Sequence, residues 1–476
     1  MTKIAVFALV IFSLFTSCNN DDDNGLQTTQ SNEIKSFVWK GLNSWYFWQN
    51  EIPELSDSYF SSNDAYNGYL NNYSSADNLF YHLLNNYPTT DKFSWIVDDY
   101  NVLLASFAGN STDFGYNFGL VRINGTDEIY GYVRYVLPNS PAANAGVTRG
   151  KIFRKVNGIN LTVSNYSDLL FNNTTYTLGF GTVSGTSPNM TVTTNGQTSQ
   201  LTATTIAENP VFYTNTYTMG SKKVGYLVYN SFTSTYNTQL NEAFGAFKSQ
   251  NITDLVLDLR YNGGGSVETA KYLASMINGN NNGKVFAKLN FNSKHQSENS
   301  NYTFSDKMKT GEVIHSLSIN KVYVLVSNSS ASASELIING LKPYMNVILI
   351  GTKTQGKNMG SITLFDSPST DYTDTNGVNT SHKWAMQPLV FRISNSLNQS
   401  DYSNGFVPET SNNVNELDYV SNLKPLGDTS EPLLAKALFL VSTSPKFALP
   451  TKAISNQFLF SDSNEGKILG NEMYVR

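Results

Sequence analysis

The arrangement of hydrophobic and polar positions is most informative in the second half of the chain. Residues 321–326, KVYVLV, form a short run of β-branched, aromatic and aliphatic residues, which predicts a buried strand. Small polar residues interrupt it, and apolar positions then recur at helical spacing from Ala333 until Pro343 ends the pattern. Residues 345–350 are a second apolar run. The pattern therefore predicts a unit of strand, loop, helix and strand.

Similar patterns predict the elements on either side of this unit. Apolar residues keep helical spacing over residues 34–48 and 76–86, which indicates a small helical region near the start. Strand and helix patterns alternate from residue 223 to residue 350, as in a largely parallel α/β layer. An amphipathic helix is expected over 432–441, whereas residues 446–476 give no clear pattern and form a tail whose role the sequence leaves open.

Length and composition bound the class of protein. At 476 residues the chain is too long for one core, and two to four domains are expected. It is 40% hydrophobic and 14% charged with a net charge of -5, so it is globular and lacks the basic surface that nucleic acid requires. The oligomeric state cannot be derived from these values.

The first residues have the pattern of an export signal. A short positive start is followed by a twelve-residue apolar run at 4–15, too short for a membrane span, which needs about twenty residues. The segment FTSC at 15–18 closes the run with Cys18, the single cysteine, and resembles a bacterial lipobox. This resemblance implies a lipoprotein signal peptide over residues 1–18, cut before Cys18, and lipid anchoring through Cys18 in a bacterial cell envelope, at the periplasmic or surface face of the outer membrane. An ordinary signal peptide is the alternative, and residues 19–32 are expected to be a flexible tether.

The predicted strand-to-helix turn carries candidate chemistry. Hydrolysis of an amide by a hydroxyl needs a nucleophile, a base for its proton and N–H donors for the oxyanion. Ser332 can supply the hydroxyl, the amide of Ala333 lies at a helix N-terminus, and Lys357 is a possible base because burial disfavours the charged form of a lysine. The plainer interpretations are an S-x-x-E capping box formed with Glu335 and a solvated lysine.

Four motifs together resemble one protein family. They are SASASE at 330–335, GTKTQGK at 351–357, LDLRYNGGG at 257–265 and GFVPE at 405–409. In this order they resemble the carboxy-terminal processing (tail-specific) serine proteases. The resemblance implies a crotonase-like (ClpP/crotonase) catalytic domain over residues 208–445.

The same resemblance implies roles for single residues. Ser332 would be the nucleophile and Lys357 its base, with the amides of Ala333 and Gly264 as oxyanion donors. The family commonly has a glutamine four residues after the lysine, where this chain has Ser361. Whether Ser361 can orient the pair is open, and a catalytically impaired peptide-binding lipoprotein of the same fold is the alternative function. No metal or organic cofactor is implied.

A second domain is expected between residues 111 and 207. GYNFGL at 115–120 resembles the carboxylate-binding loop of a PDZ domain, and residues 140–158 resemble the helix, strand and tight turn that follow. This β-rich α+β domain would bind the C-termini of protein or peptide substrates through Phe118, Gly119 and Leu120. A β-domain that only packs on the core is the alternative.

The remaining candidates are few. Residues 33–110 would form the N-terminal helical region, which completes a multidomain α/β protein. Asp258 and Arg260 are expected to form a structural ion pair. A Ser/His/Asp triad stays open, because sequence cannot show which residues are neighbours in space. The four candidate histidines for it are His82, His295, His315 and His382.

Overall fold

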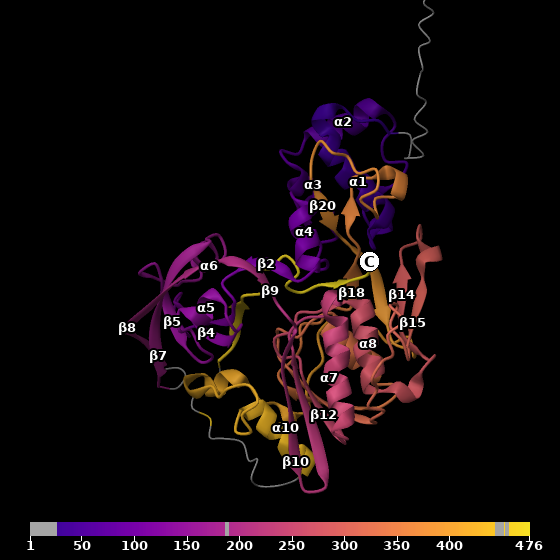
Figure 1. Ribbon diagram of the computed structural model, residues 1–476. Helices are drawn as coiled ribbons and strands as arrows, with labels where there is room; N and C mark the ends of the chain where they lie inside the picture. The colour runs from indigo at the N-terminus through magenta and orange to yellow at the C-terminus, as the bar shows by residue number, and fades with distance from the viewer. Residues whose placement is uncertain (1–25, 186–189, 443–451, 453–456) are drawn as a thin grey trace, which may run out of the picture.

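The computed structural model describes residues 26–185, 190–442, 452 and 457–476. Figure 1 shows three bodies: an N-terminal helical region, a β-rich domain at the side and an α/β core. In these described residues, no helix is both long and apolar enough to cross a bilayer. Cys18 lies outside the described residues.

The α/β core is built on a five-stranded sheet in the order β10-β11-β12-β16-β17. The last four strands are parallel and β10 is antiparallel to β11, so the expected parallel layer is confirmed. The strands are β10 (Val211–Met219), β11 (Lys222–Tyr229), β12 (Asp254–Asp258), β16 (Lys321–Val326) and β17 (Asn346–Gly351).

Helices cover both faces of this sheet because successive side chains of a strand point to opposite sides. Val322 and Val324 pack in the large cluster beneath α7 (Asn237–Ser249), α8 (Val267–Ile277) and α9 (Ala333–Leu341). Tyr323 and Leu325 pack on the other side with α10 (Pro432–Ser442). The continuous apolar pattern of β16 thus reflects burial on both faces.

The N-terminal helical region is joined to the core. It contains α1 (Glu33–Trp45), α2 (Asn63–Asn71) and α3 (Ala76–His82), whose apolar side chains belong to the same cluster as α8 and α9. The helices predicted over 34–48 and 76–86 are each shorter than expected. β1 (Trp95–Val97) then pairs with β20 (Ala385–Gln387) in a three-stranded sheet completed by β19 (Leu364–Phe365), which joins this region to the core.

The prediction of a flexible tether over residues 19–32 is wrong for its last residues, 27–32. The amides of Gln27 and Thr29 donate hydrogen bonds to the side chains of Asn63 and Asn67 on α2, both at 2.9 Å, and Asn32 is buried. These hydrogen bonds from the backbone to asparagine side chains hold residues 27–32 against α2, so this part of the predicted tether is packed.

The β-rich domain has its own hydrophobic core and a sheet in the order β22-β3-β4-β5-β7-β8. β2 (Asn110–Asp113) and β9 (Thr204–Ala207) pair where the chain enters and leaves the domain. The sheet strands are β22 (Leu459–Asp462), β3 (Tyr116–Arg122), β4 (Ile129–Val136), β5 (Ile152–Val156), β7 (Thr175–Ser184) and β8 (Thr191–Thr202).

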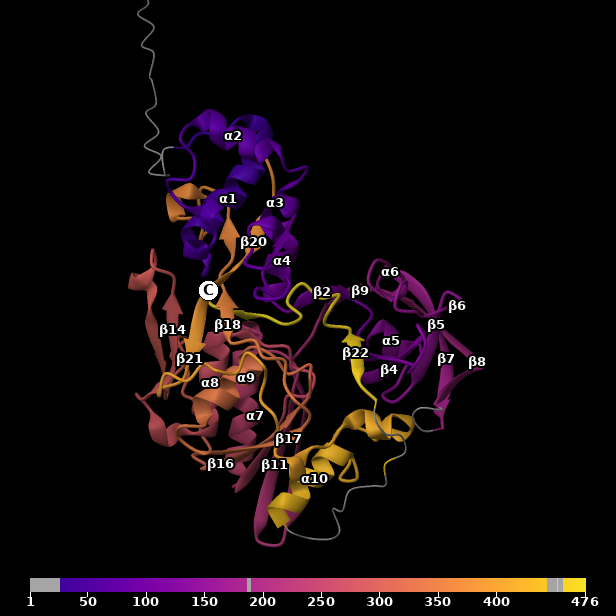
Figure 2. The same ribbon diagram turned by 180° about the vertical axis from the view of Figure 1, so that it is seen from behind.

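Residues 457–476, hereafter the tail segment, return from α10 to both domains. β22 lies at the edge of the β-rich sheet, and Figure 2 shows the chain running from there to the core. There β23 (Met473–Tyr474) pairs with β13 (Gly265–Ser266) and β18 (Met359–Ser361). The segment that gave no pattern in the sequence therefore connects the two largest parts of the molecule.

A buried cluster of charges holds the β-rich domain on the core. Arg260 pairs with Asp258 at 2.8 Å, as expected, and also with Glu431 at 2.6 Å. Arg149 reaches across from the β-rich domain and pairs with Glu416 at 2.6 Å. Burial raises the pKa of Glu416, but the guanidinium groups of Arg149 and Arg260 outweigh it and lower that pKa to about 2. The charged groups buried between the two domains are thus paired with one another, which holds the domains together.

Candidate active site

Ser332 lies in a strained turn at the start of α9. Its φ is +64° and ψ is -116°, a conformation that non-glycine residues adopt at a cost of about 1–3 kcal/mol. The side chain is buried, and its hydroxyl has no hydrogen-bond partner among the described residues. A buried, unpaired hydroxyl at a strained turn is a feature of catalytic serines rather than of serines that only begin a helix.

Two sources of N–H groups lie beside this serine. The amide of Ala333 is at the first turn of α9, and within the described residues it donates no hydrogen bond. Gly264 is so close that a Cβ placed on it would lie 2.6 Å from the Cβ of Ser332 and 3.0 Å from the nitrogen of Ala333. The glycine loop and the helix N-terminus therefore meet at the serine.

Within the glycine loop the amides are used differently. The amide of Gly264 donates to the side-chain oxygen of Asn262 at 2.9 Å. The amide of Gly265 donates instead to the backbone carbonyl of Glu472 at 2.5 Å. Gly265 is thus the loop residue whose N–H holds a peptide carbonyl, whereas the role of Gly264 as oxyanion donor stays a prediction.

Lys357 is buried at the same site, but it does not bond to Ser332. Its Nζ donates to the carbonyl of Asn471 at 2.8 Å and to Oε1 of Glu472 at 3.1 Å. The ring of Phe93 lies 4.9 Å from the same nitrogen. The structure therefore brings the lysine to the serine's neighbourhood while its polar contacts go to the tail segment.

Glu335 connects the serine turn to the lysine loop. One carboxylate oxygen accepts from the amides of Ser332 at 3.0 Å and Lys357 at 2.8 Å. The other accepts from the hydroxyl of Thr354 at 2.6 Å and the amide of Gly356 at 2.7 Å. Burial raises the pKa of Glu335 to about 7, although these hydrogen bonds act in the opposite direction. The capping motif identified this residue, but nothing local indicated that it also holds the lysine loop.

Ser361 reaches Lys357 only through another residue. Its hydroxyl donates to Oε2 of Glu472 at 2.8 Å and accepts from Nε2 of Gln387 at 3.0 Å. Trp95 donates to Oε1 of Glu472 at 2.7 Å. Sequence reasoning missed Gln387, Trp95 and Glu472 because sheet pairing, and not proximity in the chain, brings them to the site.

The predicted peptide-binding residues lie on β3 and are buried. Phe118, Gly119 and Leu120 face β4 on one side, and the tail segment covers the other edge of the strand. Asp462 pairs with Gly119, and the amide of Ser463 donates to the carbonyl of Phe118 at 3.0 Å. The edge that was expected to take a peptide thus carries a strand of the same chain.

The histidines do not form a triad with Ser332, because the hydroxyl of Ser332 has no hydrogen-bond partner among the described residues. His295 stacks on Trp45 with ring centres 3.5 Å apart, and His382 lies 3.0 Å from Asp366. Across the described parts of the chain, no group of three or more His, Cys, Asp or Glu residues could hold a metal ion.

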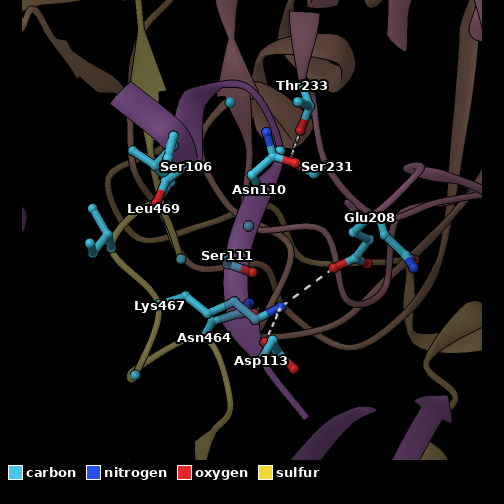
Figure 3. A pocket seen from close by; sticks show the side chains of 18 of the residues that line it. Ser106, Asn110, Ser111, Asp113, Glu208, Ser231, Thr233, Asn464, Lys467 and Leu469 are labelled. Atoms are coloured by element: carbon cyan, nitrogen blue, oxygen red, sulfur yellow. Dashed lines mark hydrogen bonds and ion pairs between the residues drawn. The ribbon is translucent and has the colours of Figure 1, made fainter. Parts of the chain in front are cut away.

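A cavity of about 570 Å³ adjoins the site. It lies between α4 (Tyr100–Phe107), β2, the glycine loop and residues 464–470 of the tail segment. Figure 3 shows Lys467 reaching across it to Asp113 and Glu208, at 3.7 and 3.5 Å. The cavity reaches residues 263–265, and the tail segment forms one of its walls, but neither Ser332 nor Lys357 lines it.

Comparison with known proteins matches two parts of the chain to one peptidase family. Residues 223–382 match Peptidase family S41, and residues 33–95 match the Peptidase S41 N-terminal domain. These two parts of the chain therefore match peptidase family S41, and the resemblance to the carboxy-terminal processing proteases is confirmed at that level.

Particular relatives agree with this assignment. A CtpA-like serine protease of Staphylococcus aureus is 30% identical over 137 residues, which are 29% of this chain and 25% of the relative. A carboxyl-terminal-processing protease of a Picosynechococcus species is 28% identical over 172 residues, 36% of this chain and 38% of the relative. The match thus spans about a quarter to two fifths of the relatives' length.

A solved structure extends the likeness to most of the fold. The crystal structure of a protein from Bacteroides fragilis assigned to the S41 proteases is 27% identical. It covers 86% of this chain and 97% of its own, with a TM-score of 0.66. The mixed α/β architecture with an N-terminal helical region is therefore that of an S41 peptidase.

Proposed function

We propose that the chain is a serine endopeptidase of the carboxy-terminal processing type, with Ser332 as nucleophile and Lys357 as base in a crotonase-like domain. The observation that carries the proposal is the hydroxyl of Ser332, which is buried and unpartnered among the described residues and lies in a turn with positive φ. Such strain persists only where the surrounding structure maintains it, and it gathers at functional sites.

The chemistry follows from the groups around that hydroxyl. Ser332 Oγ attacks a peptide carbonyl carbon while Nζ of an uncharged Lys357 takes the hydroxyl proton. The amides of Ala333 and the glycine loop hold the resulting oxyanion. When the tetrahedral intermediate collapses, the C–N bond breaks and Lys357 returns the proton to the leaving amine. Water, deprotonated by Lys357, then hydrolyses the ester and restores the hydroxyl of Ser332.

Cleavage of an unstructured protein such as β-casein tests this proposal. We expect fragments with the wild-type chain and none with Ser332→Ala or Lys357→Ala. Ser249→Ala makes the same chemical change at an exposed serine at the end of α7 and should leave cleavage unchanged. Equal cleavage by wild type and Ser332→Ala would refute the assignment of the nucleophile.

A second function is favoured by one observation. Lys357 donates hydrogen bonds to Glu472 and Asn471 and none to Ser332. This arrangement favours the alternative function, a catalytically impaired peptide-binding lipoprotein of the same fold. Binding of a labelled peptide without turnover, under all conditions that separate Lys357 from Glu472, would favour this alternative over the protease.

We also propose that the β-rich domain is a PDZ domain that captures the C-terminal segment of a substrate. The support is the strand β3, which already pairs with an added antiparallel strand, the geometry used for peptide capture. Deletion of residues 114–207 should change which of several unstructured proteins are cut. Unchanged selectivity would count against capture by this domain.

The proposed location is the bacterial cell envelope, with a lipid anchor on Cys18. It is supported by the apolar run and the single cysteine that follows it. Expression of the full chain in a bacterium should place it in the membrane fraction, and Cys18→Ala should release it. A membrane-bound Cys18→Ala variant would exclude anchoring through this residue.

A further inference from the structure

We propose that the tail segment is a built-in peptide ligand of the chain's own cleft, and that it must leave before a substrate can enter. The proposal deepens the proposed function, on which it rests, because it assigns an occupant to the same site. The tail segment fills two positions that a bound peptide would need: the edge of β3 and the space beside the glycine loop.

At the β-rich domain the tail segment binds like an added strand. β22 is antiparallel to β3, with Ser461 opposite Leu120 and Asp462 opposite Gly119. Ser463 completes the pairing, since its amide donates to the carbonyl of Phe118 and its hydroxyl accepts from the amide of the same residue at 3.3 Å. Main-chain hydrogen bonds of this kind bind peptides of many sequences.

In the cleft the tail segment makes peptide-like contacts with the candidate catalytic groups. The carbonyl of Glu472 accepts from the amide of Gly265, and the carbonyl of Asn471 accepts from Nζ of Lys357. A Cβ on Gly264 would lie 2.2 Å from the same Glu472 carbonyl and 2.6 Å from the Cβ of Ser332. The backbone of residues 471–472 therefore occupies the space next to the nucleophile.

Charge complementarity supports a specific fit between the tail segment and the rest of the chain. Asp462 pairs with the buried Arg134 of β4 at 2.9 Å. Lys467 lies between the carboxylates of Asp113 and Glu208, as Figure 3 shows.

The third pair is at the catalytic lysine. The carboxylate of Glu472 is almost fully buried, and it receives Lys357, Trp95 and Ser361 at once. Three charged side chains of the tail segment are thus paired with opposite charges at three separate places in the chain.

The contact with Glu472 also determines what the lysine can do. The hydrogen bonds of Lys357 Nζ go to a carbonyl and a carboxylate of the tail segment, so this nitrogen does not face the hydroxyl of Ser332 as a base would have to. Because the tail segment belongs to the same chain, its effective concentration at the cleft is high, and an incoming peptide must compete with it. A substrate is therefore expected to be an extended peptide that replaces the tail segment on β3 and beside residues 263–265.

The test uses the full chain with a substitution that preserves shape. Glu472→Gln removes the charge that holds Lys357 but keeps the side chain's size. Glu242→Gln makes the same change on an exposed face of α7 and is the matched control. In a Ser332→Ala background, the probe is a fluorescein-labelled synthetic peptide with the sequence of residues 457–476, and binding is followed by fluorescence polarisation.

We expect the labelled peptide to bind the Glu472→Gln chain at least about tenfold more tightly than either its parent or the Glu242→Gln chain, because the internal copy is held less firmly. Trp95→Phe, which removes only one hydrogen bond to Glu472, should give a smaller increase and guards against misfolding of the first variant. Equal binding by all chains, with circular dichroism unchanged, would overturn the proposal.

Activity separates this proposal from the proposed function. With Ser332 present, Glu472→Gln should cleave β-casein at least several times faster than the wild type. Tighter peptide binding without any cleavage would support the built-in ligand while refuting the protease. Rapid Ser332-dependent cleavage of the wild-type chain within residues 457–476, seen by mass spectrometry, would overturn the proposal because the tail segment would then be a substrate.

Discussion

Replacing Glu335 by glutamine should separate catalysis from stability. Each oxygen of the Glu335 carboxylate accepts two hydrogen bonds, so one side chain fixes the turn of Ser332 and the loop of Lys357. Glutamine keeps one acceptor oxygen but turns an NH₂ group toward two donors. The variant therefore cannot hold both loops as the carboxylate does.

The effect on stability can be worked out from the pKa. Burial raises the pKa of Glu335 from 4.5 to about 7, which corresponds to about 3 kcal/mol against the ionised form. Because the pKa of Glu335 is higher in the folded than in the unfolded state, the protonated side chain favours the folded state. This contribution to the free energy of unfolding is complete below about pH 4.5 and is lost as the pH rises through 7. Glutamine avoids the buried charge but leaves two donors unpaired, at about 1–3 kcal/mol each. The two effects are of similar size and opposite sign.

The expected result is a large change in rate with a small change in stability. At pH 8 the free energy of unfolding of Glu335→Gln should differ from that of the wild type by no more than about 3 kcal/mol. The turnover number should fall at least about tenfold, because a displaced nucleophile or base loses much of its effect. Glu242→Gln is the control. Each variant is measured twice, once with Glu472 intact and once in the Glu472→Gln background.

The pH dependence provides the readout that a purely structural role would not change. The wild-type rate should show an inflection near pH 7, where Glu335 ionises and becomes a full acceptor, and Glu335→Gln should lack it. An unaltered turnover number together with an unaltered inflection near pH 7 would refute the positioning role of Glu335.

Two further predictions concern the glycine loop and the buried charges. Gly264→Ala puts a methyl group 2.6 Å from the Cβ of Ser332 and 2.2 Å from the carbonyl oxygen of Glu472, at a φ of +120°. Cleavage of β-casein should therefore fall at least about a hundredfold, and the labelled tail peptide should bind more weakly; normal cleavage would exclude a tight oxyanion site there. Glu416, with a pKa lowered to about 2, should contribute about 3 kcal/mol that is present above pH 4.5 and lost between pH 4.5 and 2. Acid unfolding should therefore be less steep in Glu416→Gln, and an identical acid transition would show that Arg149 and Arg260 do not hold this carboxylate.

Local patterns were sufficient to predict the elements that carry the candidate dyad. β16 begins and ends at the predicted residues, and α9 begins at Ala333, because both are buried and their apolar periodicity is complete. The turn between them puts Ser332 at the helix start, as the small polar residues indicated. A continuous buried segment can therefore be recognised from the apolar periodicity of its own residues.

The surroundings of Lys357 could not be predicted in this way. Glu472 is 115 residues away in the chain and lies in a polar segment without periodicity. Gln387 and Trp95 approach because β1 pairs with β20 in a register that aligns these two residues. Contacts that depend on sheet register and on the return of a distant segment leave no local pattern. The identity of the oxyanion donor, Gly264 or Gly265, depends on where one side-chain oxygen of Asn262 points.

Covalent labelling of the nucleophile tests the central claim most directly. A fluorophosphonate reacts with an activated serine hydroxyl, and the labelled residue is identified by peptide mass spectrometry. We expect the label on Ser332, a faster reaction in Glu472→Gln, and loss of labelling in Lys357→Ala. Labelling of another residue, or labelling of Ser332 at the same rate without the amine of Lys357, would contradict a Ser332/Lys357 mechanism.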